Sequence, residues 1–243
     1  RSANAGCVFF TAAASRATGP NSLKPVSGSG SARNIAPSTP NASTSKGSWA
    51  SGSSYVSGIA APKSGSVVAT SSYDNLAKLW DASTGKLKRK FTGLRSDAYA
   101  VAMSQDGKFV ASGGPDATCH IWRAADGVLV RKLKPGQVMS IAFSPDGTLL
   151  ASGHQDSVSG DNNVHLWDMA AHEQIGELAG HTAGVQSVSF SPSGFMIASA
   201  SRDGTVRLWN VSTQRQILYM DKHAALVTNA VFSPDNAMVI SGG

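Results

Sequence analysis

A repeated unit of three short apolar runs constrains this chain more than any other feature of its sequence. The fullest copy extends from Gly180 to Asn210. Its first run, residues 185–190, alternates with a period of two, which predicts a strand rather than a helix. Asp203-Gly204 separates the second and third runs and is a hairpin signal, because Gly adopts the positive φ of such turns. The unit therefore predicts strand, turn, strand, turn, strand.

The same unit recurs along most of the chain. Tryptophans end the third runs at intervals of 42, 45 and 42 residues: Trp80, Trp122, Trp167 and Trp209. An Asp precedes each of them by six residues: Asp74, Asp116, Asp161 and Asp203. A four-residue turn precedes each second run; four copies end in Gly and the fifth in Asn236, which also tolerates positive φ. A period of about 40–45 residues with these landmarks is typical of a β-propeller blade.

On these residues the chain from about Tyr55 to Gly243 resembles the WD-repeat (WD40-type) family. The motifs that carry the resemblance are Gly180-His181, Trp80-Asp81 and Trp167-Asp168. The resemblance implies an all-β WD-repeat propeller fragment with four complete four-stranded blades and half of a fifth. The expected blades lie at about 55–97, 98–135, 136–180, 181–221 and 222–243, the last incomplete. The next Trp would fall beyond Gly243, so we expect a fragment of a longer protein.

Residues 1–54 differ sharply in composition from the repeats. They are rich in Ser, Ala and Gly and carry five basic and no acidic side chains. Such a segment cannot bury enough apolar surface to offset its ordering entropy, which predicts a disordered tail or linker. A transit peptide is the alternative, although the chain begins with Arg1 rather than Met. Residues 55–243 carry 16 basic and 15 acidic side chains, so we expect no nucleic-acid-binding domain.

Several classes of site are not expected from the sequence. Cys7 and Cys119 are the two cysteines and are not expected to form a structural disulfide, which favours an intracellular location, cytoplasmic or nuclear. No apolar run approaches the roughly 18 residues of a membrane span. The histidines outside the Gly-His positions show no metal-ligand spacing, so no metal or cofactor is expected. These histidines are His120, His154, His165 and His172.

The resemblance also implies a structural tetrad in blade four. Its members would be His181, Ser199, Asp203 and Trp209. In the family the His imidazole bridges the turn Asp and the strand Ser, and this series of hydrogen bonds extends to the Trp indole N–H. A hydrolase triad is rejected, because the four residues lie within one repeat and no GxSxG motif occurs. Only this blade has the complete set, so we expect it to be the most stable, with blades one to three relying on apolar packing.

The insertion DSVSGDNN in blade three leaves one assignment open. Counting forward from Gly147 places Asp156 in the turn position, whereas counting back from Trp167 places Asp161 there. The loop lacks the ligand pattern of an EF-hand, so a surface loop is favoured over a calcium site.

The resemblance implies a non-catalytic scaffold for protein or peptide partners. The repeat register places candidate partner-binding residues on the face with the turns before each third strand and the connections entering each first strand: Tyr73, Tyr99, Pro115, Gln137, Gln155 and Arg202. The alternative is phosphoinositide or nucleic-acid binding by the basic fourth strands and the tail. A propeller enzyme would need His, Asp or Glu clusters in the first strands, and the sequence shows none there, so no small-molecule substrate is expected.

Overall fold

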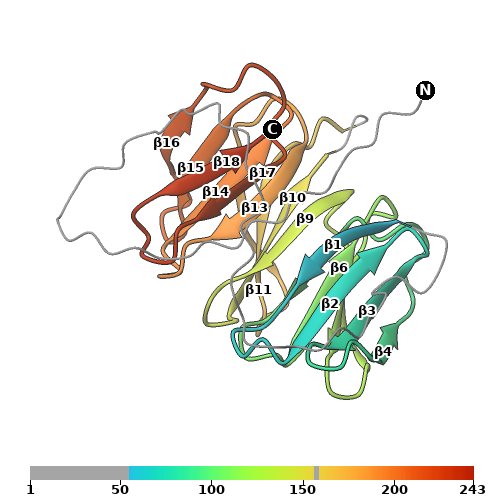
Figure 1. Ribbon diagram of the computed structural model, residues 1–243. Coiled ribbons are helices and arrows are strands. Elements are labelled where there is room, and N and C mark those ends of the chain that lie inside the picture. Colours follow the sequence, from blue (N-terminus) through green and yellow to red (C-terminus); the bar gives the residue numbers. More distant parts are fainter. Residues whose placement is uncertain (1–54, 156–158) are drawn as a thin grey trace, which may run out of the picture.

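The computed structural model describes residues 55–155 and 159–243, and all the regular structure there is β (Figure 1). The all-β prediction is therefore confirmed. The predicted tail of residues 1–54 and the residue Asp156 lie outside the described residues. Within the described ranges no helix has the length and apolar character needed to cross a membrane.

Four antiparallel sheets of four strands, and one pair of strands, follow one another along the chain. Blade one contains β1 (Val56–Ala60), β2 (Val67–Ser72), β3 (Leu76–Asp81) and β4 (Leu87–Phe91). Blade two contains β5 (Ala100–Met103), β6 (Phe109–Gly113), β7 (Cys119–Arg123) and β8 (Leu129–Leu133). Blade three contains β9 (Val138–Phe143), β10 (Leu149–His154), β11 (Val164–Asp168) and β12 (Gln174–Leu178). Blade four contains β13 (Val185–Phe190), β14 (Met196–Ser201), β15 (Val206–Asn210) and β16 (Gln216–Met220), and the pair is β17 (Asn229–Phe232) with β18 (Val239–Gly242).

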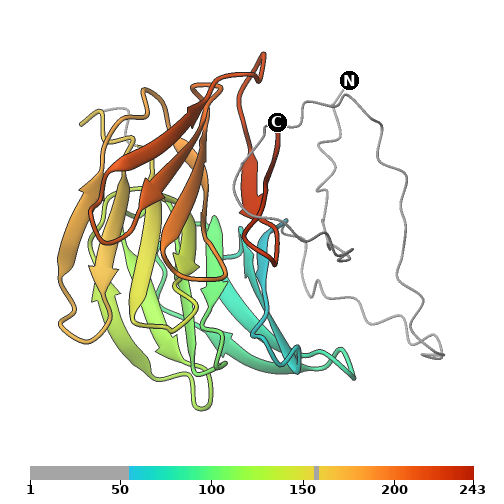
Figure 2. The same cartoon turned by 90° about the vertical axis from the view of Figure 1, so that its left-hand side faces the viewer.

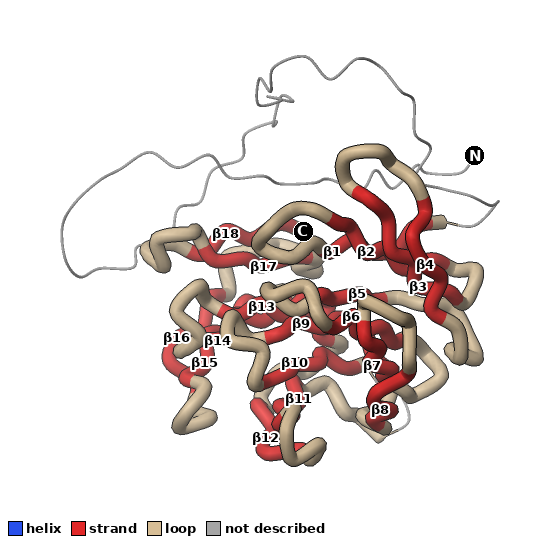
Figure 3. Tube along the Cα trace, turned by 90° about the horizontal axis from the view of Figure 1, so that it is seen from below, coloured by secondary structure: helices blue, strands red, loops and turns tan. Residues whose placement is uncertain are grey.

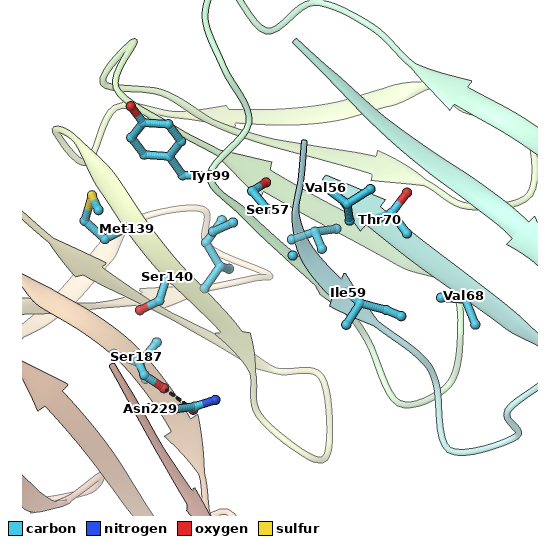
Figure 4. Close-up of a pocket in the computed structure, with 15 residues that line it drawn as sticks. Val56, Ser57, Ile59, Val68, Thr70, Tyr99, Met139, Ser140, Ser187 and Asn229 are labelled. Atoms are coloured by element: carbon cyan, nitrogen blue, oxygen red, sulfur yellow. Dashed lines mark hydrogen bonds between the residues drawn. The ribbon is translucent and has the colours of Figure 1, made fainter. Parts of the chain in front are cut away.

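The first strand of each blade faces the centre of the arrangement. β1 contacts β5, and the contacts continue in order through β9 and β13 to β17 (Figure 3). Together with β2, these strands line an open pocket of about 670 Å³, from β1 in the first blade to Asn229 on β17. Figure 2 shows the β17–β18 pair turned toward blade one. Hydroxyl and aliphatic side chains make up most of the lining, together with the larger Tyr99 and Met139 (Figure 4).

The core lies between neighbouring blades rather than within a single sheet. Trp122 of blade two packs in one buried cluster with Leu79 and Phe91 of blade one, and the Phe91 and Trp122 ring centroids are 5.4 Å apart. Trp167 likewise packs with Ile121 of blade two. Each repeated Trp in these clusters therefore joins its blade to the preceding one, which explains why a large apolar residue recurs at this position.

The turns before the second strands have the backbone geometry that the sequence predicts. Gly65, Gly107, Gly147 and Gly194 have φ values of 64°, 74°, 74° and 79°, and Asn236 has 61°. A side chain with a Cβ is strained at this φ, and Asn is among the residues that tolerate it best. The prediction of positive φ at all five turns is confirmed.

Candidate functional site

A buried polar network crosses blade four. His181 lies in the connection that enters the blade, Ser199 on β14, Asp203 in the β14–β15 turn and Trp209 on β15. Asp203 Oδ2 is 2.9 Å from His181 Nδ1, and His181 Nε2 is 2.7 Å from Ser199 Oγ. The indole N–H of Trp209 donates to the same Ser199 Oγ at 2.8 Å. The structure thus brings the four residues together in one chain of hydrogen bonds from the turn to the core.

The charges of this network follow from its contacts. Burial alone would raise the pKa of Asp203, but hydrogen bonds from the Thr205 hydroxyl, the Thr182 amide and His181 outweigh it and lower that pKa to about 2. Burial lowers the pKa of His181, although Asp203 opposes the shift. At neutral pH an ionised carboxylate therefore faces a neutral imidazole. Ser199 is fully buried and already accepts the indole N–H, so the set is built to stabilise the blade.

Blade three rebuilds this network with a histidine from another place in the fold. His154, at the end of β10, is fully buried, and its Nε2 lies 2.8 Å from Ser152 Oγ. Trp167 donates its indole N–H to Ser152 Oγ at 2.9 Å, as Trp209 does to its serine. The expectation that blade three relies on apolar packing for lack of a histidine is wrong. The imidazole lies beside Gly136 in the connection before β9, where an added Cβ would be 3.7 Å from His154 Nδ1.

The blade-three turn contains the aspartate that the sequence left undecided. Asp161 Oδ1 accepts the backbone N–H of Asn163 at 3.1 Å. Asp203 makes the same contact with the amide of Thr205, at 2.9 Å. Asp161 therefore has the turn-capping geometry expected for this position.

Asp161 also faces a second histidine of blade three. Its Oδ2 is 3.3 Å from His165 Nε2, and the His165 ring stacks on His154 with centroids 4.2 Å apart. Potential ligand atoms of these three side chains all lie within 4.8 Å of one another. The sequence spacing gave no sign of this, because the chain folds back between β10 and β11 to bring them together.

Blades one and two use further substitutes. In blade one Thr70 takes the serine position, and the Trp80 indole donates to its Oγ1 at 2.9 Å. Lys78 is buried and pairs with the turn residue Asp74. The expectation of purely apolar support is therefore wrong for blade one as well, since a hydroxyl and an ion pair replace the missing histidine.

Blade two has no imidazole bridge to its strand serine of the blade-four kind. Asp116 accepts the backbone N–H of Arg95 at 3.0 Å and that of Thr118 at 3.1 Å. His120 instead stacks on Trp122, with ring centroids 5.5 Å apart and planes 14° from parallel. That blade two relies on apolar packing stays a prediction.

The predicted partner-binding residues lie on the loops at one end of the blades, which we call the turn face. Tyr73, Gln137 and Arg202 are exposed there, whereas the remaining candidates, Tyr99, Pro115 and Gln155, are half-buried. Two pairs among them are in contact: the rings of Tyr73 and Tyr99, and the backbones of Gln155 and Gln137, where the Gln155 N–H donates to the Gln137 carbonyl at 3.4 Å.

A row of three tyrosines is the most distinctive feature of the turn face. The ring centroids of Tyr73 and Tyr99 are 5.5 Å apart, and those of Tyr55 and Tyr73 are 6.3 Å apart. Partial burial, then Tyr99 and Asp97, raises the pKa of Tyr73, which keeps its hydroxyl protonated. Figure 4 shows Tyr99 at one end of the central cavity, with its hydroxyl directed away from Ile59 and Val68.

Sequence reasoning missed Tyr55, which is 79% exposed. Its carbonyl accepts the backbone N–H of Tyr73 at 3.1 Å, so the antiparallel pairing of β1 with β2 places the two rings side by side. The pairing register across the first turn would have predicted this neighbour.

Fold, repeat and buried networks together define a β-propeller repeat protein. The model for the "WD domain, G-beta repeat" matches residues 43–81, 85–123, 127–168 and 172–210, well over half of the chain. The chain belongs to the WD40 repeat family. Each of the last three matches contains the outer strand of one blade and the three inner strands of the next, so successive blades are linked through shared repeats.

Similar proteins from Arabidopsis thaliana include three with different names. The chain is 32% identical over 139 residues to "Autophagy-related protein 16", covering 56% of this chain and 26% of that protein. It is 36% identical over 63 residues to "Pre-mRNA-processing factor 19 homolog 2", covering 26% and 11%. It is 35% identical over 69 residues to "Small ribosomal subunit protein RACK1z", covering 28% and 19%. The chain therefore matches less than a third of the length of each of these relatives.

Proposed function

We propose that this chain is a non-catalytic platform that binds a protein or peptide partner through the turn face. The tyrosine row carries the proposal. Tyr55 and Tyr73 are 79% and 45% exposed, yet their rings pack in a T-shaped, edge-to-face arrangement, and Tyr73 also packs against Tyr99. Rigid, amphipathic tyrosine side chains lose little entropy on binding and are enriched among residues that dominate interface affinity.

The relatives support the general class of function and leave the process open. Their printed names refer to autophagy, to pre-mRNA processing and to the small ribosomal subunit. What they have in common with this chain is the repeat. A shared architecture in proteins of unrelated names fits a binding platform, because fold alone does not specify a reaction or a pathway.

The central cavity supports a non-catalytic role. Its lining comes mostly from the first strands, with Val68 and Thr70 from β2, and is dominated by Val, Ile and Ser side chains. Among the described residues that line it there is no His, Asp or Glu, the types that supply general acids and bases.

Binding to phosphoinositide or nucleic acid through the outer strands is the second candidate. Several of the basic groups there already have partners. Lys88 lies 3.7 Å from Asp81, and the guanidinium of Arg89 donates to the carbonyls of Ala125 and Asp126. Groups engaged in this way contribute less to a free basic surface, so the turn face is favoured.

Affinity capture with the intact tagged chain in its native cells tests this choice. If the chain is a protein-binding platform, a defined protein partner should be captured at moderate salt. Arg202→Glu should weaken the binding of this partner and Lys88→Glu should leave it unchanged, since only Arg202 lies on the turn face. Retention of lipid or nucleic acid alone, released as salt rises, would support the outer-strand candidate instead. A partner whose affinity is unchanged by Arg202→Glu and lost with Lys88→Glu would contradict binding at the turn face.

A further inference from the structure

We infer that blade three contains a binding site for a divalent first-row transition-metal ion of the Zn²⁺ class, with His154, Asp161 and His165 as ligands. Potential ligand atoms of these side chains lie within 4.8 Å of one another. Two imidazoles and one carboxylate are a donor set that Zn²⁺ and its neighbours bind well. The inference does not depend on the proposed partner-binding function.

The ring nitrogens of blade three have unmet bonding capacity, and this distinguishes it from blade four. In blade four a single imidazole is bonded at both nitrogens, by Asp203 and by Ser199. Blade three has two buried imidazoles and one carboxylate. Nδ1 of His154 and Nδ1 of His165 are both buried without a hydrogen-bond partner among the described residues. A buried polar atom without a partner destabilises the folded state. An ion bound to Nδ1 of His154 would remove this unfavourable free energy at that atom.

The orientation of His154 suits a ligand. Its Nε2 is held by Ser152 Oγ at 2.8 Å, and the same oxygen accepts the Trp167 indole N–H. Nδ1 is therefore the nitrogen that could ligate a metal. The hydrogen bond at Nε2 fixes the ring, as the second ring nitrogen of a metal-ligating histidine commonly does. A Cβ built on Gly136 would lie 3.7 Å from His154 Nδ1 and 3.9 Å from Asp161 Oδ2, so both atoms face the space beside this glycine.

Coordination needs shorter distances between the ligand atoms and a rotation of the His154 and His165 rings out of their stacked arrangement. Zn–N and Zn–O bonds of about 2.0–2.2 Å place tetrahedral ligand atoms roughly 3.4 Å apart. His165 Nε2 and Asp161 Oδ2 are already 3.3 Å apart, and the wider pairs would close from at most 4.8 Å. Asp161 is the most exposed of the three side chains and lies in the loop, so an ion would enter from its side. Water would complete a four-coordinate site.

The test is calorimetric titration of the metal-free full chain with Zn²⁺. We expect one equivalent to bind, and Asp161→Asn to weaken binding at least tenfold while retaining the turn contact to Asn163. The matched control is Asp116→Asn in blade two, where the turn has one nearby imidazole, His120, and it should leave the affinity unchanged. Binding that survives Asp161→Asn, or that Asp116→Asn reduces equally, would overturn the site.

Cobalt spectroscopy of the unaltered chain provides a readout that needs no variant. Stoichiometric Co²⁺ should give intense visible d–d bands typical of a four-coordinate ion, and Zn²⁺ should abolish them by displacement. Only the weak bands of hydrated six-coordinate Co²⁺ would overturn the proposal. His165→Gln should remove the strong bands, whereas His120→Gln, at the same repeat position in blade two, should retain them.

Discussion

At the scale of single residues, the turn aspartate makes different contacts in different blades. The turn aspartate of blade four caps the turn and holds an imidazole, because Asp203 contacts Thr182, Thr205 and His181. In blade two Asp116 caps its turn and accepts the Arg95 amide but is bonded to no imidazole. Identical residues in register therefore differ in how much stability depends on them.

Asp203→Ala should destabilise the chain more than Asp116→Ala. Removing Asp203 leaves the buried Nδ1 of the neutral His181 ring and the amides of Thr182 and Thr205 without their acceptor, and each buried polar group left unsatisfied typically costs about 1–3 kcal/mol. Removing Asp116 deletes hydrogen bonds in a more open turn, at about 1–2 kcal/mol. Thermal or urea unfolding measures both. Equal shifts in the two variants would show that the His181 contact adds nothing.

At the scale of elements, the sequence predicted the strands but only part of the polar network. The period of two, the Gly turns and the Trp spacing are local signals, so strand order and positive-φ turns followed from them. The role of His154 did not, because the imidazole enters the network from β10 instead of from the preceding connection. Only the pairing of β10 with β9 and β11 shows that it reaches the position that His181 occupies in blade four.

The pH dependence of stability should report this buried histidine. Burial, followed by the nearby His165, lowers the pKa of His154 from 6.5 to about 3. Between these values the unfolded state binds more protons than the folded state, so the free energy of unfolding falls as pH falls from 6.5 toward 3. The slope contributed is at most about 1.4 kcal/mol per pH unit.

The matched measurement uses His154→Gln in the presence of a metal chelator. Its unfolding free energy should depend less steeply on pH between 6.5 and 3 than that of the unaltered chain. Some slope should remain, because burial also lowers the pKa of His181 and His120. Parallel pH curves for the two proteins would show that His154 titrates normally in the folded state.

At the scale of the whole molecule, stability is shared across blade boundaries. Trp122 packs against Leu79 and Phe91 of the preceding blade, and the repeat matches also cross from one blade to the next. In such a chain each unit is stabilised by its neighbours, and damage should be felt on both sides of a boundary.

Trp122→Ala should therefore loosen blades one and two together. The loss of a fully buried Trp typically costs about 3–5 kcal/mol. Hydrogen exchange should accelerate in β1–β4 as well as in β5–β8, with β13–β16 affected least. Acceleration confined to blade two would contradict a core shared between the blades.

Partner binding by the tyrosine row of the turn face can be tested by a single comparison of affinities. The most direct measurement is the dissociation constant of the captured partner for Tyr73→Ala and for Tyr219→Ala. These side chains are 45% and 46% exposed, but Tyr219 lies on the outer strand β16. We predict at least a tenfold weaker complex for Tyr73→Ala, about 1.4 kcal/mol, and no change for Tyr219→Ala. Unchanged affinity for Tyr73→Ala, with a loss for Tyr219→Ala, would place binding on the outer edge and contradict binding by the tyrosine row.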